Sequence, residues 1–118
     1  MKDDRLYLIH ISECIDRVEK YTVEGEAAFH ADSKTQDAVI RSLQIMAEST
    51  QKISQPLKLR HPEVPWRSIS FFRNITVHDY LGIDARLIWH IVEFDLPKFK
   101  SKIKEILEEM GSSTQSTP

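Results

Sequence analysis

Arg73, Asn74, His78 and Tyr80 lie within the eight residues 73–80, and their side chains suit chemistry on a phosphodiester. An arginine guanidinium keeps its charge and binds phosphate through two parallel hydrogen bonds. A histidine can both give and accept a proton near neutral pH. On an ideal helix Asn74 and His78 share a face, whereas Arg73 and His78 are about 140° apart. Spacing alone favours a structural role, with an ion-paired arginine and a buried histidine.

A second group of candidate residues precedes this motif. Lys58, Arg60, His61 and Arg67 form a local basic cluster in a chain whose net charge is −2. Because the chain as a whole is slightly acidic, any contact with RNA must be local. The cluster could follow an RNA backbone, or it could be ordinary solvated surface, and the sequence leaves both open.

Other kinds of site have no signal in the sequence. The histidines are scattered and Cys14 is the single cysteine, so neither a metal site nor a cofactor is predicted. Cys14 is expected to be a small buried residue in a reducing compartment. Trp66 and Trp89 are expected to pack in the core rather than to stack on bases. Arg41 and Glu48 are candidates for buried polar groups near the motif.

The apolar periodicity of the first half of the chain predicts two helices. The first covers roughly residues 4–23, and residues 24–32 lose the periodicity and are expected to be a loop. The sequence Ser-Lys-Thr-Gln at 33–36 resembles a capping box that begins the second helix. The residues expected on the inner faces are Tyr7, Leu8, Ile11, Cys14, Ile15, Val18, Tyr21, Val39, Leu43, Met46 and Ile53.

The second half of the chain predicts two more helices around the motif. Residues 54–65 contain three prolines and are expected to be an irregular connection. A third helix is predicted from about 66 to 80, and Asp84 is a good N-cap for a fourth. Pro97 should either kink this last helix or begin a new one capped by Asp95. The residues expected to face inward are Leu87, Ile88, Ile91, Phe99, Ile103, Ile106 and Met110.

Length and composition predict one all-α domain. A chain of 118 residues with 41% hydrophobic and 29% charged residues suits a single globular core. We expect a four- to five-helix up-and-down bundle over residues 1–110, and a disordered polar tail over 111–118. No apolar stretch approaches the roughly 20 residues that span a bilayer, and the N-terminus does not resemble a signal peptide. The sequence therefore predicts a cytoplasmic protein without a membrane segment.

The motif and its flanks resemble the HepT branch of the HEPN family, small helical toxin ribonucleases of prokaryotes. The resemblance extends over nearly the whole chain to Met110. The chain departs modestly from the family pattern at Phe72, Ala47 and Ser49. Arg-x4-His alone is a weak pattern, but the flanks make it specific. They are His61-Pro62-Glu63-Val64-Pro65-Trp66, Arg41-Ser42-Leu43-Gln44-Ile45 with Glu48, Tyr80-Leu81-Gly82-Ile83-Asp84, and Trp89 and Val92 with Asp95-Leu96-Pro97.

The resemblance implies a metal-independent RNA endonuclease with its site at a homodimer interface. Such cleavage needs a base for the 2′-hydroxyl and an acid for the leaving 5′-oxygen, and one chain supplies one well-placed histidine. Two copies of His78 could act as base and acid. Arg73 could stabilise charge on the phosphate, and Asn74 could orient the imidazole or the phosphate. The expected product carries a 2′,3′-cyclic phosphate.

Tyr80 has a separate implied role in regulation. In the HepT branch the partner is an MntA-like nucleotidyltransferase antitoxin, which transfers AMP to the tyrosine of the motif. The added phosphate would repel RNA beside Arg73 and His78. The alternatives are that Tyr80 is a packing residue, and that the whole chain is a non-catalytic helical module that binds a nucleotidyltransferase or a nucleotide.

Overall fold

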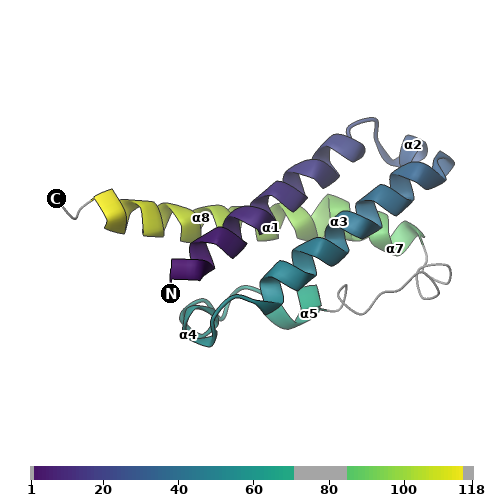
Figure 1. Ribbon diagram of the computed structural model, residues 1–118. Coiled ribbons are helices and arrows are strands. Elements are labelled where there is room, and N and C mark those ends of the chain that lie inside the picture. The colour runs from purple at the N-terminus through teal and green to yellow at the C-terminus, as the bar shows by residue number, and fades with distance from the viewer. Residues whose placement is uncertain (1, 71–84, 116–118) are drawn as a thin grey trace.

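The computed structural model describes residues 2–70 and 85–115 of the chain. In these ranges the regular structure is helical and no strand occurs, so the predicted all-α class is confirmed there. Helices α1 (Lys2–Tyr21) and α3 (Ser33–Gln51) lie side by side, and the C-terminal helix α8 (Leu96–Gln115) packs across α1 (Figure 1). The number of helices in a complete bundle and the homodimer stay predictions.

The predicted inner stripe of α1 forms the centre of the core. Leu8, Ile11, Ile15 and Val18 are buried, as their spacing predicts. Cys14 is also buried, which confirms its expected packing role, and burial raises the pKa of its thiol. The predicted stripe is wrong at its C-terminal end, because Tyr21 at the last position of α1 is exposed.

The loop predicted over residues 24–32 is wrong, because α2 (Glu26–Ala31) forms there. Gly25 precedes α2 with a φ of 96°, a backbone conformation that favours glycine. Phe29 is buried in the middle of α2, with its ring centroid 5.4 Å from that of Trp89. Six residues are too few to show helical periodicity, and contact with the rest of the core stabilises the helix instead.

Helix α3 is capped one residue earlier than the predicted capping box. Oδ1 of Asp32 accepts a hydrogen bond of 3.0 Å from the backbone N–H of Lys34, and the Thr35 hydroxyl donates one of 2.9 Å to Oδ2. The hydrogen bond from Thr35, followed by that from the Lys34 backbone, lowers the pKa of the Asp32 carboxyl below its usual value of 3.8. Asp32 therefore replaces Ser33 as the N-cap.

The predicted irregular connection over 54–65 contains helix α4 (Gln55–Arg60). Ser54 is its N-cap, and Pro56 is tolerated in the first turn because no intrahelical N–H is needed there. Across the fold, the carboxylate of Asp4 accepts hydrogen bonds from the Ser54 backbone N–H at 2.8 Å and from the Ser54 hydroxyl at 2.6 Å. Asp4 is only 2% exposed, so these bonds anchor the start of α4 to the first turn of α1.

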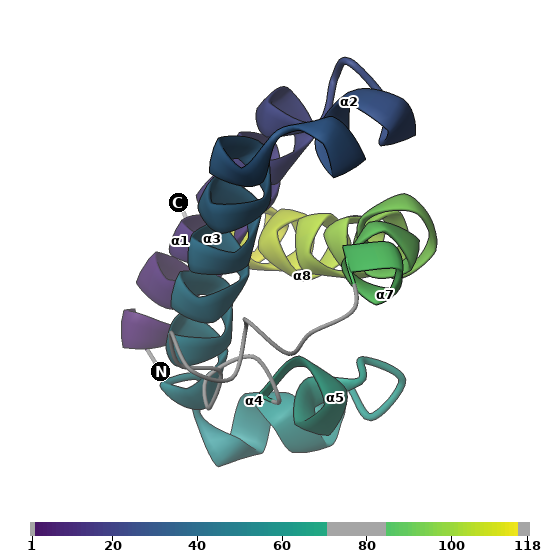
Figure 2. The same cartoon turned by 90° about the vertical axis from the view of Figure 1, so that its right-hand side faces the viewer.

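Helix α5 (Trp66–Ser70) follows Pro65, whose carbonyl accepts from the Ile69 N–H at 3.1 Å. The Trp66 indole N–H donates to the His61 carbonyl at 3.0 Å, and its ring meets that of Phe99 edge-on. Figure 2 shows α2 at one end of α3 and α4 with α5 at the other. Trp66 and the buried Trp89 are packing residues, as expected.

The last helical segment is continuous, but its hydrogen-bond pattern changes from α-helical to π-helical just before Pro97. Helix α7 (Ala85–His90) passes into a π-helical turn η2 (Ile91–Asp95) and then into α8. The Leu96 N–H donates to the Ile91 carbonyl, five residues earlier, which is the π pattern. Because proline has no N–H and its ring crowds the preceding turn, the wider turn accommodates Pro97 without a break. The alternative of a new helix capped by Asp95 is wrong.

Helix α8 continues to Gln115, so it includes the first five residues of the predicted polar tail. The domain boundary at residue 110 stays a prediction. Phe99, Ile103 and Ile106 face the core as expected, but Leu87 is exposed, which corrects its predicted inward position. Within the part of the chain that the structure describes, no helix has the length and hydrophobicity to cross a bilayer.

Candidate functional site

The motif residues Arg73, Asn74, His78 and Tyr80 lie outside the residues that the structure describes. The elements on either side of them are described. Helix α5 ends at Ser70, three residues before Arg73, and α7 begins at Ala85, five residues after Tyr80. The roles of the four motif residues stay predictions.

The four residues of the predicted basic cluster differ in their burial and in their neighbours. Lys58 on α4 is partly buried, and burial lowers the pKa of its ammonium, while the charge of Asp4 acts in the opposite direction. Arg67 is exposed on α5. Arg60 and His61, at the end of α4, together line a small cavity of about 350 Å³ that also includes Glu109 of α8. Contact of these four residues with RNA stays a prediction.

His61 already has an acidic neighbour. Its Nδ1 lies 3.5 Å from the Oε2 of Glu63, and the His61 side chain is mostly buried. The pKa of the Glu63 carboxyl is lowered, first by a hydrogen bond from its own backbone N–H and then by His61. A carboxylate beside His61 reduces its attraction for a phosphate, so Arg60 and Arg67 are the better candidates for an RNA backbone.

Arg41 and Glu48 do not fit the expectation of buried polar groups, because both are exposed on α3. Because Arg41 and Glu48 are seven residues apart, they lie on the same side of the helix. That side faces away from the core residues Leu43 and Met46. The apolar pattern of the helix alone predicts this outcome.

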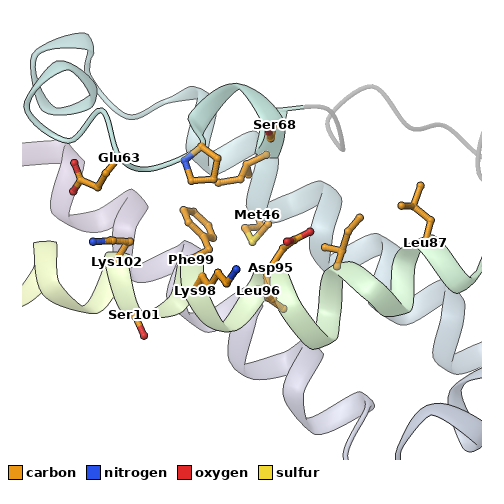
Figure 3. A pocket seen from close by; sticks show the side chains of 13 residues that line it. Met46, Glu63, Ser68, Leu87, Asp95, Leu96, Lys98, Phe99, Ser101 and Lys102 are labelled. Carbon is orange, nitrogen blue, oxygen red and sulfur yellow. The ribbon is translucent and has the colours of Figure 1, made fainter.

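A cleft of about 840 Å³ lies between α5 and the α7–η2–α8 segment (Figure 3). Met46 and Ile69 reach it from α3 and α5, and Phe99 reaches it from α8. Charged side chains complete its lining, namely Glu63 before α5, Asp95 of η2, and Lys98 and Lys102 of α8 (Figure 3). Sequence reasoning did not find this cleft, since its walls come from three separate segments of the chain.

Comparison with known proteins assigns the chain to a family. Residues 11–106 match the family described as Ribonuclease HepT-like, and this range includes the whole motif from Arg73 to Tyr80. The chain belongs to the HepT-like ribonuclease family. This places it among RNases of the HEPN type, as the resemblance of the motif implies.

The relatives of this HepT-like chain include proteins of archaea. It is 40% identical over 101 residues to "Probable ribonuclease HepT" of Thermococcus cleftensis, covering 85% of this chain and 92% of that protein. It is 36% identical over 113 residues to "Gamma-glutamylcyclotransferase and putative RNase" of Methanocaldococcus jannaschii, covering 95% of this chain. The chain spans about half of that second relative, 51%. No solved structure matches it.

Proposed function

We propose that this HepT-like chain is a metal-independent RNA endonuclease that acts as the toxin of a toxin–antitoxin pair. The observation that carries the proposal is the family match over residues 11–106, which contains Arg73 and His78 at the Arg-x4-His spacing. The residue types at this spacing suit phosphodiester chemistry on their own account.

The proposed reaction uses two copies of the chain. One His78 takes the proton of the RNA 2′-hydroxyl, and the 2′-oxygen attacks the adjacent phosphorus. The bond from phosphorus to the 5′-oxygen breaks, and the second His78 protonates that oxygen. Arg73 stabilises the additional negative charge on the phosphoryl oxygens, and Asn74 orients the imidazole or the phosphate. The products are a 2′,3′-cyclic phosphate and a 5′-hydroxyl.

Cleavage of RNA by the purified protein is expected to continue in excess EDTA, because no step of the proposed reaction uses a metal ion. The measurement is gel analysis of tRNA and mRNA fragments, with mass spectrometry of the 3′ ends to detect the cyclic phosphate. Fragments that end in a 3′-hydroxyl, or cleavage restored only by added Mg²⁺, would contradict the mechanism. Binding without cleavage would instead support a non-catalytic module.

Co-expression with an MntA-like nucleotidyltransferase is expected to add AMP to Tyr80 and to stop RNA cleavage. The adduct adds bulk and negative charge two residues from His78, which disfavours a phosphate there. Intact mass shows the number of additions, and peptide mapping shows the site. Tyr80→Phe is the matched variant, since it removes only the hydroxyl. An adduct retained in Tyr80→Phe would exclude Tyr80 as the acceptor.

A further inference from the structure

We draw no further inference here: the strongest candidate, the small cavity between the end of α4 and the C-terminal half of α8 that Arg60, His61 and Glu109 line, combines a guanidinium with a carboxylate in its lining, and nothing in the structure shows what would occupy it.

Discussion

His78→Ala is expected to slow RNA cleavage by about 10²–10⁴-fold, because it removes the proposed general base and general acid together. The variant should still bind RNA, since binding depends on the arginines and lysines that remain. The measurement is the single-turnover cleavage rate in EDTA, which separates the chemical step from product release. His30→Ala is the control. His30 is exposed on α2 and contacts only Glu26 among the ionic partners described, so its loss should leave the rate unchanged.

A mixed dimer shows whether the two histidines work at one site. One wild-type chain and one His78→Ala chain, carrying different affinity tags, can be purified as a heterodimer. If one His78 is the base and the other the acid, the heterodimer should be nearly as slow as the dimer of two variant chains. If each chain cleaves RNA by itself, the heterodimer should keep the cleavage activity of its one wild-type chain. That result would exclude the composite mechanism.

The long helices could be predicted from the sequence because each repeats its apolar pattern over several turns. In α1 the spacing from Leu8 to Val18 determines which face is buried, whatever packs on it. The short helices α2 and α4 could not be predicted in this way. Helix α2 depends on the burial of Phe29 against Trp89, and α4 begins where Asp4, fifty residues earlier, binds Ser54. Neither contact is visible in the local sequence.

The candidate site also has one part that could be predicted from the sequence and one part that could not. The motif from Arg73 to Tyr80 could be found because its residue types suit phosphate chemistry and its flanks match the family. The cleft could not, because its walls come from residues as distant as Met46 and Lys102. The π turn also changes which residues face the cleft. An ideal α-helix predicts Leu87 inside, whereas the structure leaves it half exposed beside Ile91 at the cleft wall.

The contact between Asp4 and Ser54 has the largest expected effect on stability among the described polar contacts. Asp4 is buried, and the two hydrogen bonds that it accepts from Ser54 are charge-assisted and short, at 2.8 and 2.6 Å. Removing the carboxylate would leave the Ser54 N–H without its acceptor in a partly buried place, which costs more than the loss of an exposed bond. The Ser54 hydroxyl, which also accepts from the Leu57 N–H at 3.4 Å, would lose its fixed orientation.

Asp4→Ala is therefore expected to lower the free energy of unfolding by about 3 kcal/mol, and Tm by about 12 °C for a chain of this length. Asp3→Ala is the matched control. Asp3 is exposed in the same first turn of α1, so both variants lose a similar interaction with the helix dipole. The difference between the two in urea unfolding isolates the buried hydrogen bonds. Equal losses in the two variants would show that the dipole, and not the bond to Ser54, accounts for the stability that Asp4 provides.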